Sequence, residues 1–571
     1  MNKLNKNQLN DHLTKGIILT TFIIGFCFSQ NNSMAQGELG LKFEISFSES
    51  AHSSPITGRV YVMISRTNNP EPRFQTRRSR SSPFFGKDVD DLKPGEGAVI
   101  DNEVLGFPLK SLKEIPPGDY YVQGFVNIYT EFKRSDGHTI WLHNDQWEGQ
   151  HWNRSPGNIY SDVIKVALDP SAGQIVKLIC KNVIPSVEIP PDTKWVKRIK
   201  FQSDILTAFW GRPIYLGATI LLPEGYDENP DQYYPVNYVQ GHFSLRAPGG
   251  FRTDDPGREN PRGRRGYAFY KAWTDEDCPR MIYVTFQHPC PYFDDSYAVN
   301  SANCGPYGDA IMEELIPEVE SKFRIIEKPW ARVLEGGSTG GWEAMALQVF
   351  HPDFFGGAFI YCPDPVDFSD VEGVHVYEDT NAFHRMLDWT RVIIPDSRRA
   401  DGSLILTSQQ IQQYEFVLGT RGRSGEQWDI WQAVWGPVGE DGYTRLLIDK
   451  RTGRIDPEVA KYWKENYDLR YILEKNWRTL GPKIKGKLFI FTGDMDTYYL
   501  NNPVHKLQEF MERTKNPHYP GFFQYAPRKT HCWTGDFTQP ERIQFIAKHI
   551  LQNMPEEEKV SWWNQKAEVQ R

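Results

Sequence analysis

The spacing of apolar residues along this chain changes near residue 184. Over residues 37–183, apolar residues alternate with polar ones, as at Leu41, Phe43 and Ile45. A period of two is typical of strands with one buried face, and turns rich in Pro and Gly separate the runs. The pattern predicts an all-β, antiparallel, Ig-like sandwich. Further candidate strands are Val60–Ile64, Tyr120–Tyr129, Val163–Leu168 and Ile175–Ile179.

A second pattern begins after residues 184–196, which are Pro-rich and which we expect to form an extended linker. Over residues 197–555 candidate strands and helices alternate, which favours an α/β fold with a mostly parallel sheet. The expected strands are Ile214–Leu222, Tyr234–Val239, Met281–Phe286, a short one at Val333–Leu334, Ala358–Tyr361, Lys487–Phe491 and Phe522–Tyr525. The expected helices are Asp309–Phe323 with a kink at Pro317, one directly after Ser338, Asn502–Arg513 and Pro540–Gln552.

Residues 363–485, approximately, do not keep this alternation. The segment is rich in Trp and partly helical, and Asp456-Pro457-Glu458 has the cap and proline of a helix start. We expect an insertion that lies over the carboxyl edge of the sheet as a lid.

A tight turn at Gly336-Gly337-Ser338-Thr339-Gly340 carries the pattern Gly-x-Ser-x-Gly. A serine on a strand-to-helix turn sits in a strained backbone, and the residues two before and two after it come close together. Only glycine fits there cheaply. The pattern alone is weak, and a plain Gly/Ser turn would also explain it, but the strand before it and the helix after it favour a nucleophile.

The nucleophile needs a base and a group that orients the base. Where the serine lies on a strand-to-helix turn of this kind, the chain order is Ser, acid, His. After Ser338, Asp494 and Asp496 end one expected strand and His531 follows the last one, so all should meet at one sheet edge. We favour Asp496 over Asp494 as the acid. The oxyanion donors are expected to be the amides of Thr339 and His242, with Phe243 as an alternative to His242.

Several segments together resemble the putative-esterase family, which contains feruloyl, acetyl-xylan and enterochelin esterase-like proteins. They are Ile220–Tyr226, Tyr234–Gly241, Leu315–Arg324, Gly336–Gly341 with His351–Phe355, and Gly493–Leu500. The resemblance covers about residues 200–365 and 485–550. It implies an α/β-hydrolase three-layer sandwich and a triad of Ser338, Asp496 and His531. Many members have His-Gly where this chain has Gln240-Gly241, so the oxyanion turn departs from the family.

Composition narrows the class of protein. The net charge of −8 argues against a nucleic-acid partner, and the arginines at residues 77–80 and 262–265 are interpreted as solvated loops. Residues 1–35 have the basic start, short apolar run and small residues of a signal peptide. We therefore expect a periplasmic or secreted protein, with no membrane span after cleavage.

The cysteines and a Trp-rich loop leave alternatives open. Cleavage would leave six cysteines, and a bridge among Cys278, Cys290 and Cys304, or between Cys362 and Cys532 beside the site, is compatible with export. Residues 138–152 contain several histidines and tryptophans. They could form a metal site or a sugar platform, or a loop packed by its own aromatics or against the next domain.

These observations favour an exported serine esterase that works through an acyl-enzyme intermediate and needs no metal or organic cofactor. Its partner would be a small-molecule or glycan ester. Acyl or phenolic esters of polysaccharide are an expectation from the family and from the aromatic-rich insertion. Two alternatives stay open: a serine peptidase of the same fold, and a catalytically inactive carbohydrate-binding protein. The sequence does not choose an oligomeric state.

Overall fold

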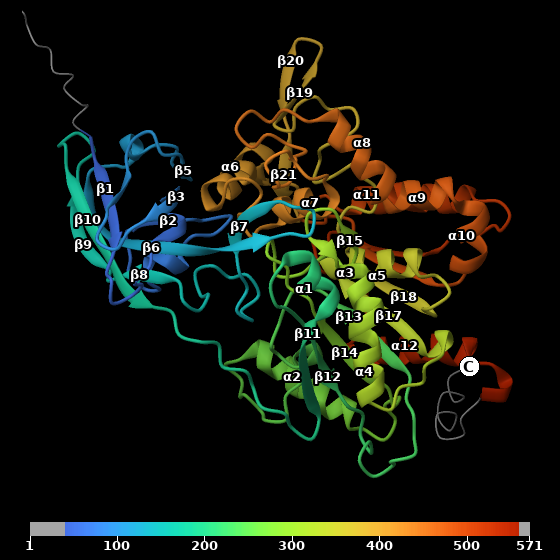
Figure 1. Cartoon of the computed structure of the whole chain (residues 1–571). Helices are drawn as coiled ribbons and strands as arrows, with labels where there is room; N and C mark the ends of the chain where they lie inside the picture. Colours follow the sequence, from blue (N-terminus) through green and yellow to red (C-terminus); the bar gives the residue numbers. More distant parts are fainter. Residues whose placement is uncertain (1–39, 559–571) are drawn as a thin grey trace, which may run out of the picture. The chain divides into compact units, whose positions relative to one another are not determined.

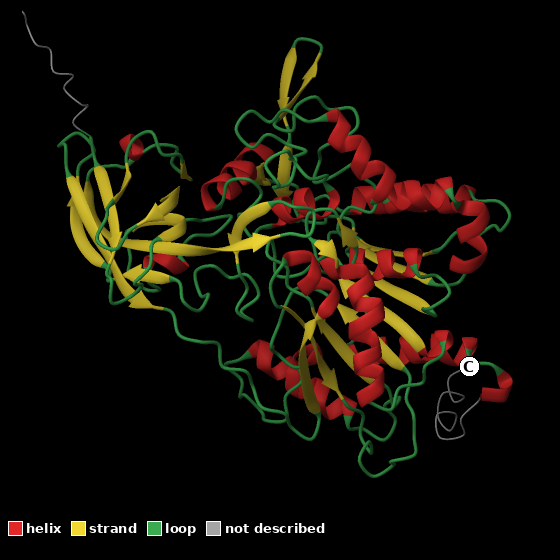
Figure 2. Ribbon diagram, viewed as in Figure 1, coloured by secondary structure: helices red, strands yellow, loops and turns green. Residues whose placement is uncertain are grey.

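The computed structural model describes residues 40–558, which belong to one compact unit. The predicted signal peptide, residues 1–35, lies outside the described residues. Figures 1 and 2 show a strand-rich N-terminal part and a larger part in which helices flank a second sheet. The predicted domain bounds 37–183, 184–196 and 197–555 follow this change of architecture and stay a prediction as domains.

The N-terminal part is one connected ten-stranded sheet, in the order β4-β1-β10-β8-β6-β2-β3-β5, with β7 and β9 beside β6. The pairing of β1 with β10 is parallel, unlike the antiparallel arrangement that we predicted. Alternate residues such as Phe43 and Ile45 are fully buried, which confirms the period-two pattern. The strands are β1 Lys42–Phe47, β2 Ile56–Ser65, β3 Phe84–Leu92, β4 Ala98–Ile100, β5 Gly106–Phe107, β6 Gly118–Lys133, β7 Thr139–His143, β8 Ile159–Ser161, β9 Ile164–Leu168 and β10 Ile175–Val183.

The aromatic residues of the 138–152 stretch pack into the protein. Trp152 stacks on Tyr61 at a centroid distance of 4.8 Å, and Trp147 meets Phe243 edge-on at 5.1 Å. Both tryptophans are buried. Because Tyr61 belongs to β2 and Phe243 follows β13, the structure favours a loop whose aromatics pack against neighbouring parts of the protein.

The second sheet has eight strands in the order β11-β12-β14-β13-β17-β18-β23-β24. The first three strands pair antiparallel, and all later neighbours are parallel. The expected α/β fold with a mostly parallel sheet is therefore confirmed. The strands are β11 Val196–Ser203, β12 Ile214–Leu221, β13 Val236–Gln240, β14 Ile282–Gln287, β17 Arg332–Gly337, β18 Gly357–Tyr361, β23 Leu488–Gly493 and β24 Phe522–Ala526; a small pair, β15 Asn300–Ser301 and β16 Gly305–Pro306, lies beside it.

Helices cover both faces of this sheet because successive residues of its central strands point to opposite sides. In β17, Val333 packs with α2 and α12, whereas Leu334 packs with the core that contains α4 and α5. The helices are α1 Asp204–Trp210, α2 Pro261–Trp273, α3 Tyr307–Ala310, α4 Ile316–Lys322, α5 Thr339–Phe350, α11 Asn501–Arg513 and α12 Gln539–Asn553. Short 3₁₀ turns are η1 Pro72–Phe74, η2 Leu112–Glu114, η3 Pro248–Gly250, η5 Pro329–Ala331 and η6 Glu556–Glu558.

Two local expectations need correction. The arginines at residues 262–265 do not lie in a loop but in α2, which begins at a cap where the Asn260 side chain accepts from the Gly263 amide. The expected helix Asp309–Phe323 is divided: a π-helical turn, η4 Ile311–Leu315, separates α3 from α4. Pro317 stands in the first turn of α4, where its missing N–H costs nothing.

The predicted insertion folds as a separate set of short elements. They are β19 His384–Leu387, β20 Thr390–Ile393, β21 Pro395–Arg398, β22 Leu404–Thr407, α6 Ser408–Leu418, α7 Gln427–Trp435, α8 Pro457–Asn466, α9 Leu469–Lys475 and α10 Trp477–Ile484. The Asp456 side chain caps α8, as predicted.

The insertion is anchored to the N-terminal sheet at the end of α6. Arg59 of β2 is buried, and its Nε donates to the Val417 carbonyl at 3.0 Å. Arg423 pairs with Asp88 of β3 at 2.8 Å. This hydrogen bond and this ion pair tie the insertion to the N-terminal sheet, so the N-terminal part helps to position whatever the insertion contributes to the site.

Candidate active site

The turn around Ser338 has the strained backbone that its sequence predicts. Ser338 has φ 59° and ψ −124°, a conformation that L-residues rarely adopt. A Cβ on Gly336 would lie 2.0 Å from the Gly340 carbonyl oxygen, and one on Gly340 would lie 2.2 Å from the Gln240 carbonyl oxygen. The two glycines are therefore required by close backbone approach, and the turn places Ser338 between β17 and the first residue of α5.

His531 and Asp496 lie directly beside this serine. His531 Nε2 is 2.7 Å from Ser338 Oγ, and its Nδ1 is 2.8 Å from Asp496 Oδ2. Asp496 is fully buried, and its other oxygen accepts from the Tyr498 amide at 2.9 Å. The structure thus brings together the three side chains that the sequence selected for a triad.

Asp494, the alternative acid, does not take this position. Its backbone N–H donates to the Ala526 carbonyl, and its own carbonyl accepts from Arg398. Because Asp496, and not Asp494, reaches His531, the geometry favours the assignment that we made from sequence.

Two cysteines adjoin the imidazole. Cys362 Sγ, Cys532 Sγ and a ring nitrogen of His531 all lie within 4.8 Å of one another. Hydrogen bonding from Cys362 and the neighbouring imidazole lower the pKa of Cys532 to about 4, against the effect of its burial. Burial alone would lower the pKa of His531, but Asp496 and the Cys532 thiolate raise it to about 10. Free imidazole, the form that can accept a proton, is therefore favoured at alkaline pH.

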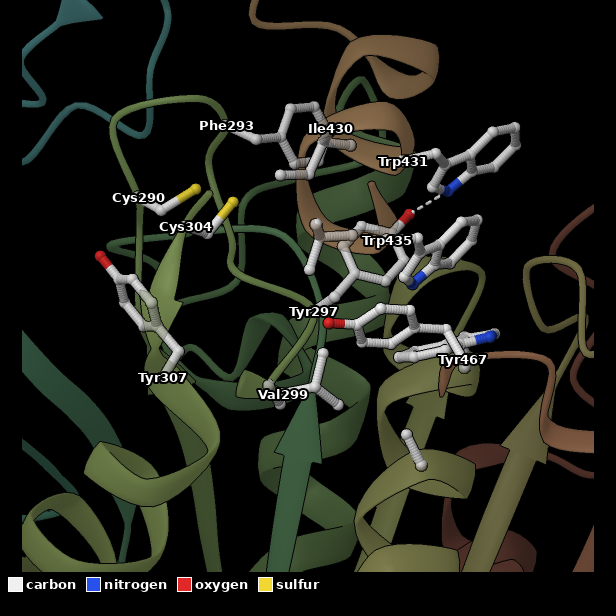
Figure 3. Close-up of a cluster of buried hydrophobic side chains, with 14 of the residues drawn as sticks. Cys290, Phe293, Tyr297, Val299, Cys304, Tyr307, Ile430, Trp431, Trp435 and Tyr467 are labelled. Atoms are coloured by element: carbon white, nitrogen blue, oxygen red, sulfur yellow. Dashed lines mark hydrogen bonds between the residues drawn. The ribbon is translucent and has the colours of Figure 1, made fainter. Parts of the chain in front are cut away.

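All six cysteines of the described residues are thiols, so the bridges that we considered are not formed. Cys290 and Cys304 are nevertheless neighbours, as Figure 3 shows, and so are Cys362 and Cys532. Cys278 lies apart and is only partly buried.

The expected oxyanion donors lie where strand ends meet the helix. Thr339 is the first residue of α5, so its amide has no acceptor within the helix. Gly241, at φ 149°, turns the chain away from β13, and His242 follows. The His242 imidazole is 3.0 Å from Asp294 and 3.2 Å from Asp295, and these carboxylates raise its pKa well above the usual value although burial opposes them. The oxyanion roles of Thr339 and His242 stay a prediction.

A buried carboxyl beside the nucleophile was missed by the sequence reasoning. Asp364 Oδ1 is 3.4 Å from Ser338 Oγ, and its Oδ2 accepts from Tyr297 at 2.5 Å and from Thr339 Oγ1 at 3.1 Å. Burial raises the pKa of this carboxyl. Its position two residues after Cys362, at the end of a strand next to β17, was the available signal.

Two residues of the insertion also bond to Tyr297 and Asp364. Trp431 of α7 donates to the Tyr297 hydroxyl at 2.6 Å, the contact drawn as a dashed line in Figure 3. Gln427, one turn earlier, donates to Asp364 at 3.1 Å. The predicted lid therefore contacts the residues that hold the serine turn.

Within residues 40–558, two groups have three side chains placed closely enough to share a metal ion: Cys362, His531 and Cys532, and His242, Asp294 and Asp295. In each group the side chains already pair with one another. None of the helices among these residues is long and apolar enough to cross a bilayer.

This fold and site define the class of esterase-type α/β-hydrolases. Residues 215–468 match the model of the family described as "Putative esterase", which confirms the resemblance seen in the sequence. The protein is thus an esterase, a carboxylic ester hydrolase. The match contains Ser338 but ends before Asp496 and His531.

Similar solved structures are enzymes of the same kind. A ferulic acid esterase shares 15% identity, with 62% of this chain and 99% of that chain covered and a TM-score of 0.35. The fluorophosphonate-binding serine hydrolase FphF of Staphylococcus aureus shares 15%, with coverages of 62% and 98% and a TM-score of 0.34. An S-formylglutathione hydrolase from Agrobacterium tumefaciens shares 12%, with coverages of 63% and 99% and a TM-score of 0.34. The curated proteins contain no match.

Proposed function

We propose that this esterase works through an acyl-enzyme on Ser338, with His531 as the base and Asp496 as the group that orients it. Support comes from the continuous chain of two hydrogen bonds, 2.7 Å and 2.8 Å, from Ser338 Oγ through the imidazole to Asp496. A serine hydroxyl barely ionises near neutral pH, so a base in direct contact is what makes it nucleophilic.

The steps follow from these contacts. Ser338 Oγ attacks the ester carbonyl carbon while its proton passes to His531 Nε2. The amides of Thr339 and His242 hold the oxyanion that forms. His531 then gives the proton to the departing alkoxide, which leaves as the alcohol. A water molecule, deprotonated by His531, attacks the acyl-enzyme and releases the acid and free Ser338.

We further propose export through the segment 1–35 to the periplasm or the medium, an Ig-like identity for the N-terminal strands, and acyl or phenolic esters of polysaccharide as substrates. The basic and apolar start of the chain supports export. The substrate class is supported by the family and by the ferulic acid esterase among the similar structures.

A fluorophosphonate probe tests the nucleophile. Wild-type protein should be labelled at Ser338, whereas Ser338→Ala should fold, as judged by circular dichroism, and stay unlabelled. Thr339→Ser, which keeps the backbone amide, serves as a labelled control. Unlabelled, folded wild-type protein, or labelling of Ser338→Ala to the same extent, would overturn the proposal.

A further inference from the structure

An arginine from the N-terminal sheet reaches the candidate active site. Arg78 lies in the loop between η1 and β3, and its guanidinium carbon is 5.4 Å from the centre of the Tyr498 ring. The Tyr498 ring in turn meets the His531 ring edge-on at 5.0 Å. The sequence suggested that the arginines at residues 77–80 are all solvated, and this holds for Arg77 and Arg80 but not for Arg78.

A second line of contacts joins Arg78 to the serine turn. A guanidinium nitrogen of Arg78 lies 4.0 Å from Glu426. The next residue, Gln427, donates to Asp364, which lies 3.4 Å from Ser338 Oγ. Two separate series of contacts, one through Tyr498 and one through Glu426, thus link this guanidinium to the surroundings of Ser338.

The guanidinium is poorly satisfied by the protein. Among the hydrogen bonds of residues 40–558, none has an Arg78 nitrogen as donor, although arginine carries five N–H groups. Glu426 at 4.0 Å is beyond hydrogen-bond range. The side chain is 26% exposed, so the donors remain accessible to a bound molecule.

Arg78 stays protonated and positively charged. Burial works against it, but Tyr498, Glu426, Asp396 and Glu372 raise the pKa of Arg78. Burial also raises the pKa of Glu426 and of Asp396, so these carboxyls ionise less readily than exposed ones. A fixed cation with free donors beside a nucleophile is suited to a carboxylate, whose two oxygens match the planar fork of a guanidinium.

We propose that Arg78 binds a carboxylate on the part of the ester that does not react, so that the enzyme prefers anionic esters over neutral esters of the same shape. The substrate would extend from Ser338 across the Tyr498 ring to the loop of the N-terminal sheet. This inference rests on the proposed function, because it assumes that the ester is cleaved at Ser338.

Matched phenyl acetates test the proposal. The anionic probes are 4-acetoxybenzoate and the longer 4-acetoxycinnamate, and the neutral probes are their methyl esters. For wild-type protein we expect kcat/KM to be higher for at least one anionic probe than for its methyl ester, mainly through a lower KM. The advantage should shrink as salt concentration rises, because screening weakens the pairing of exposed charges.

In Arg78→Gln the ratio of kcat/KM between anionic and neutral probe should fall by about 10- to 100-fold, the usual effect of losing a charged hydrogen bond. Arg78→Lys should keep part of the ratio, because it keeps the charge and loses the fork. Arg77→Gln, a neighbouring exposed arginine of the same loop, is the control and should leave the ratio unchanged.

Two results would overturn the inference: wild-type protein that prefers both methyl esters, or an Arg78→Gln ratio equal to that of wild type while the neutral probes are still cleaved. Failure of the proposed function has a different signature. In that case Ser338→Ala would cleave all four probes as fast as wild type, whatever residue stands at position 78.

Discussion

The thiol of Cys532, next to the imidazole proposed as the base, should shift the pH dependence of the enzyme. Only neutral His531 can accept the proton of Ser338, so the acid limb of kcat/KM reports the pKa of His531. The Cys532 thiolate and Asp496 both stabilise the protonated imidazole and raise its pKa to about 10. Cys532→Ser removes one of the two negative charges, so the pKa should fall and the limb should move to lower pH.

The separation of the groups gives the size of this shift. Cys532 Sγ and the imidazole nitrogen lie within 4.8 Å. At that separation a pair of unit charges interacts by about 1 kcal/mol in water and about 3.5 kcal/mol at the effective dielectric of a protein surface. Because Cys532 is exposed, we take the lower part of this range and expect a shift of about one pH unit. On the acid side of the limb, activity should therefore rise about tenfold.

The assay is kcat/KM for a neutral ester across neutral and alkaline pH, measured for wild type, Cys532→Ser and Cys278→Ser. Cys278 is a partly buried thiol that lies outside this cluster, and its variant should keep the wild-type profile. An acid limb that stays in place, or that moves to higher pH, in folded Cys532→Ser would refute the reasoning.

Three further outcomes follow from the geometry. Asp496→Asn should lower kcat by about 10⁴ while Asp494→Asn keeps most activity, and the reverse pattern would contradict our choice of acid. Gly340→Ala should yield little folded protein, because the added Cβ would lie 2.2 Å from the Gln240 carbonyl oxygen. Gly337→Ala is the control: its Cβ would lie 3.7 Å from the nearest atom, and thermal melts should show a folded protein. Lys450→Met should lower the free energy of unfolding in urea by about 3–5 kcal/mol, because Lys450 pairs with two buried carboxylates, Glu415 at 2.6 Å and Asp429. A smaller loss would mean that these carboxyl groups are already neutral.

The parts of the fold that periodicity dictates were predictable from the sequence. Seven of the strands in the second sheet were expected close to their observed bounds, because each is an apolar run bounded by turn residues. β11, Val196–Ser203, was missed because its exposed edge position gives it polar residues and no clear alternation. The π-helical turn at Ile311–Leu315 likewise leaves the apolar spacing almost unchanged, so the sequence does not reveal it.

The residues of the candidate site likewise include some that the sequence indicates and others that it does not. Ser338, Asp496 and His531 follow the ends of strands, and they could be selected from the serine turn, the chain order and the family resemblance together, although Asp494 stayed an alternative acid. Asp364, just after β18, carried a similar signal that we did not use. Arg78 could not be selected, because its role depends on where a loop of one segment meets another. No periodic pattern along the chain encodes that contact between distant segments.

The junction between Arg59 and the end of α6 also limits how this protein can be divided. The buried guanidinium satisfies backbone carbonyls of Val417 and Phe416, and Tyr61 donates to the Leu418 carbonyl at 2.5 Å. A truncated hydrolase expressed without its N-terminal strands would expose those carbonyls and the aromatic face around Tyr414, and it would also lose Arg78. If Arg78 binds a substrate carboxylate as proposed, swapping the N-terminal strands between relatives should transfer substrate preference together with stability.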